Sequence, residues 1–404
     1  MTSTTAELGR TTRSAGPGVW LGVGSIVLSS ISAMTPVFGV AALATPIERD
    51  LHISSTGFGL MLSGFFAVSA LGAPLARRLA GRIRVPLMLA GINGAALTAL
   101  LLGALLPGIG ALVAALLLAG AANALTQPAA GRYIAARVPS HRLSMAAGML
   151  SAALGAAPLL PGVLAALVAQ PLGWHAALGV AALLPLVSLL TTPLARLNQD
   201  RTTTSSPGTP QTAPVAPSAR TNAILLLWTI AAGLATIGSN IAASYFVQLG
   251  TQSGLSTATA GLMQSMAAVV AVVVRLLVGV LADRAPRRNP AIVAAMMFSG
   301  AIGLALISMA TIGTFTIGAL LAVAGGWGWT GLLLAAIMRL LPGQGAKAGA
   351  TVQIGLFGGA AVAPFAFGAA SAAFGMATTV QLAAILVVIA TGAMIVGARL
   401  QRNA

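Results

Sequence analysis

The sequence predicts an all-α integral membrane protein with twelve transmembrane helices in two pseudo-repeated six-helix halves. Three observations carry this prediction: the composition, the length of the apolar runs and the placement of the basic residues. The mean hydropathy of the 404 residues is +0.96, and only 6% of them are charged. Because soluble domains carry about 25% charged residues, this chain lacks the polar surface that a water-exposed globule needs. Lipid is therefore the expected solvent for most of the chain.

Twelve apolar runs are each long enough to cross a bilayer as a helix, which takes about 20 residues. In chain order they cover residues 19–44, 56–76, 86–106, 110–133, 144–168, 175–194, 222–247, 259–281, 290–309, 312–337, 349–373 and 376–397. Their continuous Ala- and Leu-rich character does not fit the alternating strands of a β-barrel. A Ser-, Thr- and Pro-rich stretch after the sixth run reads as a flexible linker. The predicted organisation is a cytoplasmic tail (1–18), a first half (19–195), a cytoplasmic linker (196–221), a second half (222–397) and a cytoplasmic tail (398–404).

The basic residues test this helix count independently. With a cytoplasmic N-terminus, every basic residue except Arg49 falls on the cytoplasmic side, with Arg275 about two turns inside the eighth helix. The positive-inside rule expects this bias, and a wrong helix count would scramble it. We therefore expect a multi-pass protein of the cell membrane (inner or plasma membrane) with both termini cytoplasmic. The Ala- and Gly-rich composition with a single lysine, Lys347, is typical of a GC-rich bacterial genome.

The two halves show a weak internal repeat. Gly59 and its neighbours match Gly261 and its neighbours at an offset of 202 residues, and Pro158 matches Pro364. Several such pairs occur in order at similar offsets, which favours a duplicated six-helix unit of the kind that many secondary transporters contain.

The loop after the eighth run carries the most specific motif. It reads Gly279-Val280-Leu281-Ala282-Asp283-Arg284-Ala285-Pro286-Arg287-Arg288, which resembles the signature G-x-L-A-D-R-x-G-R-R of the major facilitator superfamily (MFS). The resemblance in architecture extends over residues 19–397. It implies the MFS fold, transport of a small solute by alternating access, and a latch between the cytoplasmic ends of the halves. The latch candidates are Gly279, Asp283, Arg284, Arg287 and Arg288. The alternative is that these arginines only signal topology.

The fifth run resembles a second family motif in part. Gly148, Gly155, Pro158 and Gly162 follow the antiporter signature ending G-P-x-x-G-G, but Ala157 replaces the glycine before the proline. The match slightly favours export over uptake and adds Pro158 and Gly162 to the gating candidates. Close packing through small residues explains the same pattern equally well. Leu116 stands where the family tends to carry an arginine, which speaks against the usual proton coupling of drug exporters.

Catalytic chemistry finds little support in the sequence. None of the five acids lies within an apolar run, and the chain has no cysteine. The three histidines, His52, His141 and His175, fall at helix ends or in loops without metal-ligand spacing. No phosphate-binding loop or acid/base pair is visible. We therefore expect no enzyme, cofactor, metal or nucleic-acid partner.

Neutral polar residues inside the runs are the binding candidates. Because the resemblance implies that helices 1, 4, 7 and 10 line a central cavity, several of them are placed around a substrate. The candidates are Ser29, Ser32, Asn123, Gln127, Asn240, Gln264, Trp327 and Gln353. For the serines and amides, helix–helix packing is the alternative. Tyr245 and Gln248 are expected at the membrane interface.

These observations favour a monomeric secondary transporter in the lipid bilayer that moves a small solute. A cavity without acids predicts a neutral, weakly polar or amphipathic solute. The alternative is a non-transporting membrane sensor or assembly factor on the same scaffold. The residues leave the coupling ion open.

Overall fold

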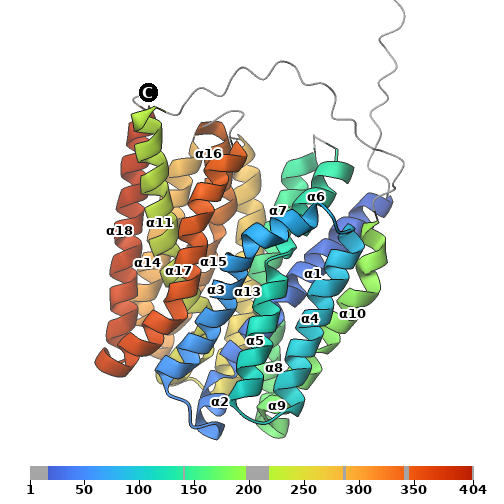
Figure 1. The fold of residues 1–404 in the computed structure, drawn as a ribbon. Coiled ribbons are helices and arrows are strands. Elements are labelled where there is room, and N and C mark those ends of the chain that lie inside the picture. The colour runs from blue at the N-terminus through green and yellow to red at the C-terminus, as the bar shows by residue number, and fades with distance from the viewer. Residues whose placement is uncertain (1–16, 140–141, 197–217, 285–287, 341–344, 403–404) are drawn as a thin grey trace, which may run out of the picture.

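The computed structural model describes residues 17–139, 142–196, 218–284, 288–340 and 345–402, and every regular element among them is a helix (Figure 1). The first part of the chain forms α1 (Pro17–Ala42), α2 (Ala44–Asp50), α3 (Ser55–Ala80), α4 (Val85–Leu105), α5 (Ile109–Asn123), α6 (Thr126–Arg137), α7 (Leu143–Ala156), α8 (Leu159–Leu167), α9 (Ala169–Ala181), α10 (Leu183–Thr191) and the 3₁₀ turn η2 (Thr192–Ala195). The second part forms α11 (Ala219–Ser244), α12 (Phe246–Gln252), α13 (Thr257–Arg284), α14 (Asn289–Ile307), α15 (Ile312–Gly328), α16 (Thr330–Leu340), α17 (Gly345–Phe374) and α18 (Met376–Arg402). We call these parts the N-half (17–196) and the C-half (218–402).

Twelve segments of the described chain are long and apolar enough to cross a membrane, in the order that the sequence predicts. Eight are built on the single helices α1, α3, α4, α11, α13, α14, α17 and α18, whereas the other four are assembled from consecutive pairs: α5 with α6, α7 with α8, α9 with α10, and α15 with α16. The sixth span starts at Ala169, earlier than expected, and Gly173, with φ of 83°, kinks the helix near that start. The protein is thus a multi-pass, twelve-span membrane protein.

Prolines explain three of the four breaks inside spans. A proline lacks an N–H, and its ring clashes with the carbonyl four residues before it. Pro128 follows the break at Ala124 by four residues, and Pro161 follows the break at Ala157 by the same distance. Pro185 lies three residues after the break at Ala182. The apolar runs therefore cross the membrane as bent rather than straight helices.

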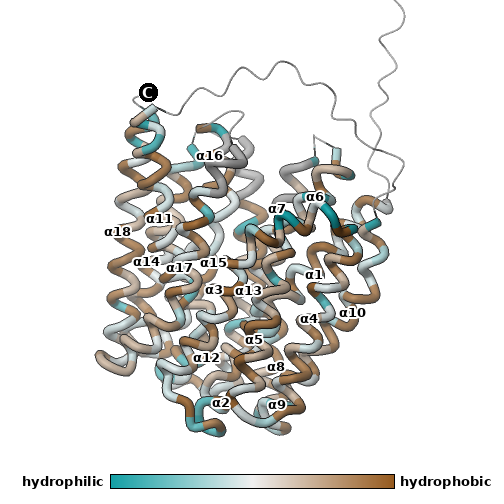
Figure 2. The backbone as a smooth tube through the Cα atoms, in the orientation of Figure 1, coloured by the Kyte–Doolittle hydropathy of each residue, from teal (hydrophilic) through white to brown (hydrophobic). Residues whose placement is uncertain are grey.

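The bundle has two distinct ends (Figure 1). Helices α2 and α9 lie at one end, which we call the α2 end, and the C-terminus lies at the other, which we call the linker end because residues 196 and 218 flank the linker there. Hydrophobic residues dominate the helices between the two ends, and hydrophilic stretches gather at the ends (Figure 2). This is the distribution expected of a bundle that crosses a bilayer.

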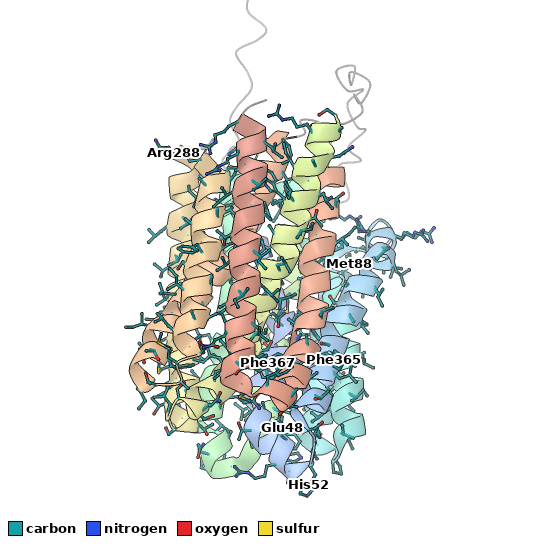
Figure 3. All side chains as sticks on the ribbon, turned by 90° about the vertical axis from the view of Figure 1, so that its left-hand side faces the viewer. Glu48, His52, Met88, Arg288, Phe365 and Phe367 are labelled. Carbon is teal, nitrogen blue, oxygen red and sulfur yellow. The ribbon has the colours of Figure 1, made fainter. Side chains whose placement is uncertain are left out.

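Charged side chains separate along the same axis. Glu48 and His52 lie at the α2 end, and Arg288 lies at the linker end (Figure 3). Arginines also occupy the last turns of three helices that finish at the linker end, α3, α6 and α18. Cations are favoured there because the C-terminus of a helix carries partial negative charge.

Candidate functional site

The contact between α3 and α17 joins the two halves near the α2 end. A Cβ on Gly59 would lie 2.2 Å from the Pro364 carbonyl oxygen, and a Cβ on Gly368 would lie 2.2 Å from the Ser55 carbonyl oxygen. Only glycine permits backbones to come so close. Thr56 Oγ1 adds a hydrogen bond to the Gly368 carbonyl at 3.3 Å. The first turns of α3 thus pack directly on the last turns of α17.

A proline kink supplies a further hydrogen bond across this contact. Pro364 interrupts the backbone ladder of α17, and the next N–H, that of Phe365, donates to Ser63 Oγ of α3 at 2.9 Å. Between α11 and α12, the Tyr245 hydroxyl donates to the Pro364 carbonyl at 2.8 Å, and the centre of its ring lies 4.3 Å from that of the Phe367 ring. Two backbone groups at the kink, the Phe365 N–H and the Pro364 carbonyl, thus have side-chain partners on neighbouring segments.

At the α2 end itself, a carboxylate links the halves. Gln248 Nε2 of α12 donates to Glu48 Oε2 of α2 at 2.9 Å. Burial raises the pKa of Glu48 above its ordinary value, and the hydrogen bond from Gln248 opposes that shift. Tyr245 and Gln248, which the sequence analysis expects at the membrane interface, are buried within the protein, with exposed fractions of 0% and 5%. They are buried because they complete the contact between the halves.

A second contact between the halves runs along α8 and α13. A Cβ on Gly162 would lie 2.4 Å from the Gly261 carbonyl oxygen, and a Cβ on Gly261 would lie 2.5 Å from the Gly162 carbonyl oxygen. Ser265 Oγ donates to the Leu159 carbonyl at 2.7 Å. This pair of glycines is reciprocal, so neither position has room for a side chain while the halves are in contact.

Arg275 lies farther along α13, inside the eighth span, and it bridges the halves. Its side chain is 6% exposed. Nη1 donates to the Ser151 carbonyl of α7, Nη2 donates to the Trp327 carbonyl of α15 at 2.9 Å, and Nε has no partner. An arginine in a span costs about 2.5–3.5 kcal/mol on insertion scales, so it usually marks function.

The charge of Arg275 has no carboxylate partner among the side chains that the structure describes. Glu48 and Asp50 lie on α2, at the far end of the bundle. Asp283 follows Arg275 by eight residues on the same helix, which is about 12 Å along its axis. Two carbonyl dipoles thus hold a buried cation that a carboxylate would satisfy better.

Several predicted cavity residues pair with neighbours inside their own half. Each makes a hydrogen bond that joins two helices or two turns of one helix. These bonds run from Asn93 Nδ2 to Ser29 Oγ (2.9 Å), from Asn123 Nδ2 to Ser69 Oγ (2.9 Å) and from Ser244 Oγ to Asn240 Oδ1 (2.8 Å). Trp327 likewise donates its Nε1–H to the Ser239 carbonyl at 2.7 Å. Packing between helices, the alternative given for serines and amides, thus accounts for the contacts of Ser29 and Asn123, whereas the Ser244–Asn240 bond lies within α11.

Other candidates contain buried polar atoms without a partner. They are Ser32 Oγ, Asn240 Nδ2 and both amide atoms of Gln264. Gln264 is 3% exposed and lies eleven residues before Arg275 on α13. Gln127 and Gln353, in contrast, are exposed. The structure thus does not gather the predicted cavity residues into one cluster of contacts, and their role in binding stays a prediction.

Metal chemistry has no cluster to support it in the described part of the chain, where no group of three or more His, Asp or Glu side chains could hold an ion. Asp50, for example, accepts a hydrogen bond from Trp174 Nε1 at 3.1 Å. The acids at the α2 end therefore serve in contacts between helices.

Comparison with known protein families identifies the family to which the chain belongs. The family model described as Major Facilitator Superfamily matches residues 25–364. The chain belongs to this superfamily. Over 160 residues it is 30% identical to the "Tetracenomycin C resistance and export protein" of Streptomyces glaucescens, an alignment that covers 38% of this chain and 30% of that relative.

Solved structures show the same fold. A bacterial homologue of the human lysosomal transporter Spinster, in an inward-facing and unoccupied conformation, superposes with a TM-score of 0.73 at 15% identity, covering 96% of this chain and 99% of that one. Its inward-facing and occupied form gives 0.70 at 15% identity, covering 93% and 96%. The predicted twelve-helix MFS fold is confirmed.

The MFS motif residues fall in different parts of the structure. Gly279, Asp283 and Arg284 lie at the end of α13, where the side chains are outside the described part, and Arg287 lies outside the described residues altogether. Arg288 is exposed at the start of α14. The latch proposed for this cluster therefore stays a prediction.

The positions that resemble the antiporter signature lie within the described part of the structure. Pro158 caps α8 directly after the break in the fifth span, and Gly162 lies one turn farther on in the α8–α13 contact. A Cβ on Gly148, in contrast, would meet nothing within 4 Å. Gly162 is thus a contact residue, and Gly148 is a natural control for it.

Sequence reasoning missed Arg275, Glu48 and Ser63 as contacts between the halves. Arg275 was grouped with the topology-setting arginines, although Val274 and Leu276 beside it showed that it lies within an apolar run. Glu48 carried no signal, because its partner is 200 residues away. Ser63 falls in the internal repeat, but a repeat does not reveal which helix its side chain meets.

Proposed function

We propose that this MFS protein exports a small solute across the membrane by alternating access, with the halves separating first at one end and then at the other. The observation that carries the proposal is the kind of contact at the α2 end. Glycines and single hydrogen bonds join the halves there. A hydrogen bond contributes only about 0.5–1.5 kcal/mol net, so such a contact can open and close reversibly.

The orientation belongs to the same proposal. The arginines that end α3, α6 and α18 gather at the linker end, which the positive-inside rule assigns to the cytoplasm. The α2 end then faces outward in a bacterial plasma membrane. In this orientation the structure is closed to the outside, and a solute would enter from the cytoplasm.

Export is supported by the name of the relative from Streptomyces glaucescens, a resistance and export protein. Tetracenomycin C is therefore the first solute to test. The likeness covers 30% of that relative's length, so the solute is part of the proposal. The Spinster homologue is also a transporter, and none of these likenesses favours a sensor, an assembly factor or an enzyme.

Cysteine accessibility tests alternating access, because the chain has no native cysteine. Thr56→Cys places a thiol in the α3–α17 contact, and Ser54→Cys places one at the exposed start of α3 as a matched control. With a membrane-impermeant maleimide outside whole cells, the Ser54 variant should react quickly and the Thr56 variant slowly. A transported solute should raise the Thr56 rate alone.

The direction of transport can be measured in a host strain that lacks its own exporters. Cells that express the chain should accumulate less tetracenomycin C than cells carrying an empty vector. If accumulation rises instead, the chain is an importer. If Thr56→Cys reacts as fast as Ser54→Cys under every condition, the closed outer side is wrong.

A further inference from the structure

We propose that Arg275 binds the anionic group of the transported solute, so that the substrate class is an organic anion with an apolar body. The anion site deepens the proposed function. It rests on that function in one respect: the bound molecule is taken to be the transported solute. It revises the expectation of a neutral solute, which treated Arg275 as a topology charge.

The guanidinium of Arg275 has more donors than partners. An arginine has five N–H donors in a planar fork that matches a carboxylate. Arg275 uses Nη1 for the Ser151 carbonyl and Nη2 for the Trp327 carbonyl, while Nε has no partner. At 6% exposure, water cannot supply the missing acceptor freely. The guanidinium therefore lacks an acceptor for part of its N–H donors while the two halves are in contact at this level.

The two carbonyls that Arg275 contacts belong to different halves of the molecule. Ser151 belongs to α7 in the N-half, whereas Trp327 belongs to α15 in the C-half, as Arg275 itself does. When the halves separate at this level, Arg275 keeps the Trp327 carbonyl and loses the Ser151 carbonyl. A carboxylate entering the gap would replace the lost acceptor and neutralise the charge. Anion binding is thereby coupled to separation of the halves.

The α7 backbone and one buried face of α13 form the surroundings of Arg275. A Cβ on Gly155 would lie 3.2 Å from Nη1, so α7 approaches the guanidinium with backbone rather than with a side chain. Along the same buried face of α13, at a spacing of seven to eleven residues, lie Ala268, at 0% exposed, and Gln264, whose amide has no partner. Ala268 and Gln264 lie about 10 and 16 Å from Arg275 along the helix axis, so an elongated apolar body can lie along this face, and the Gln264 amide can donate to or accept from a second polar group.

A thermal-shift experiment on the purified full chain in detergent tests this proposal. The probes are aromatic carboxylates from benzoate to anthracene-2-carboxylate, each paired with its uncharged primary amide. Binding to the folded state raises the melting temperature with ligand concentration, which gives an apparent Kd. The readout is the ratio of amide to acid Kd. A merely structural arginine would change the melting temperature without changing this ratio.

The expected result is that at least one acid binds the wild type tenfold or more tightly than its amide. Arg275→Gln should bind the two equally, and Arg402→Gln, which removes an exposed arginine outside the proposed gate, should behave as the wild type. The proposal is overturned if no acid in the panel exceeds its amide in the wild type, or if the preference persists in Arg275→Gln.

Should Arg275→Gln fail to fold, Arg275→Lys decides. Lysine keeps the charge and loses the planar fork, so the acid preference should fall at least threefold, and an unchanged preference would overturn the proposal. The outcome is separable from that of the proposed function. Export without an acid preference refutes only the anion site, whereas an acid preference in a chain that never opens at the α2 end refutes only the transport cycle.

Discussion

The two ends of the bundle are held together differently. At the α2 end, hydrogen bonds run between the halves, from Gln248 to Glu48 and from Phe365 to Ser63. At the linker end, Arg132 donates to the Ala80 and Ile83 carbonyls within the N-half. Arg220 likewise donates to the Leu400 carbonyl within the C-half.

This difference teaches where motion is expected. Bonds within a half stiffen that half, and bonds between halves set the balance between conformations. Alternating access requires both: rigid halves, and a contact that is weak enough to break. A ligand or mutation can shift this balance only by its differential free energy in the two states.

The largest expected effect comes from breaking the reciprocal glycine contact between α8 and α13, which joins the halves. In Gly162→Ala, the new Cβ would lie 2.4 Å from a backbone oxygen, so α8 and α13 must move apart. Overpacking costs typically 1–3 kcal/mol, which corresponds to a roughly 5- to 150-fold shift toward the separated state. The Thr56→Cys labelling rate should rise accordingly. Gly148→Ala, which meets nothing within 4 Å, should leave the rate unchanged, and an equal response of both variants would refute the contact.

The second effect concerns the motif at the linker end. If Asp283 latches that end when it closes, Asp283→Asn should favour the state that is closed at the α2 end and open at the linker end. A partly screened charge contact is worth roughly 0.3–2 kcal/mol. Labelling of Thr56→Cys should then slow by up to about thirtyfold at unchanged folded yield. No change would leave Asp283 as a surface charge.

The third effect is a pH dependence at Glu48. Its pKa is raised in the closed contact and returns to its ordinary value when water reaches it, so the contact favours the protonated form. Closure at the α2 end should be strongest below the ordinary pKa and should weaken as pH rises through the raised one. Gln248 faces the carboxyl group, while the sequence neighbours Arg49 and Asp50 are exposed.

The measurement is the ratio of Thr56→Cys to Ser54→Cys labelling between pH 5 and 8, which cancels the pH dependence of the thiol. The ratio should rise with pH in the wild type. In Glu48→Gln it should stay flat at the low-pH value. A dependence of the same size in Glu48→Gln would assign the titration to another group.

The smallest conformational effect is expected within a half. Arg132→Gln removes donors to the carbonyl of Ala80, the last residue of α3, and to the Ile83 carbonyl in the turn that follows; cations stabilise such a helix end. The melting temperature should fall, while Thr56→Cys labelling should not change. Arg402→Gln, at an exposed position, serves as the control for lost surface charge. A clear change in labelling would show that the linker-end bonds also govern the balance.

Most of the fold could be predicted because its causes are local. Lipid selects long apolar runs, and these are visible residue by residue in the sequence. The loop signature Gly279 to Arg288 named the family for the same reason. The helix breaks at Ala124 and Ala157 were missed, although the prolines that cause them are plain in the sequence.

The contacts between the halves could not be predicted. Gln248 and Tyr245 have the amphipathic character of interfacial residues, and only their distant partners, Glu48 and Pro364, make them buried. In the sequence, Arg275 resembles the arginines that set topology, and only its two carbonyl partners distinguish it from them. Such pairings depend on tertiary geometry across 50 to 200 residues, which no local pattern encodes.

The most direct test of the account is a pair of distance measurements by spin labelling. One pair, Ser54→Cys with Ser256→Cys, spans the halves at the α2 end, and the other, Arg84→Cys with Arg288→Cys, spans them at the linker end; all four positions are exposed. When a transported solute is added, the account predicts that the first distance lengthens in the same fraction of molecules in which the second shortens. Distances that change together, or that do not respond at either end, would contradict alternating access about these contacts.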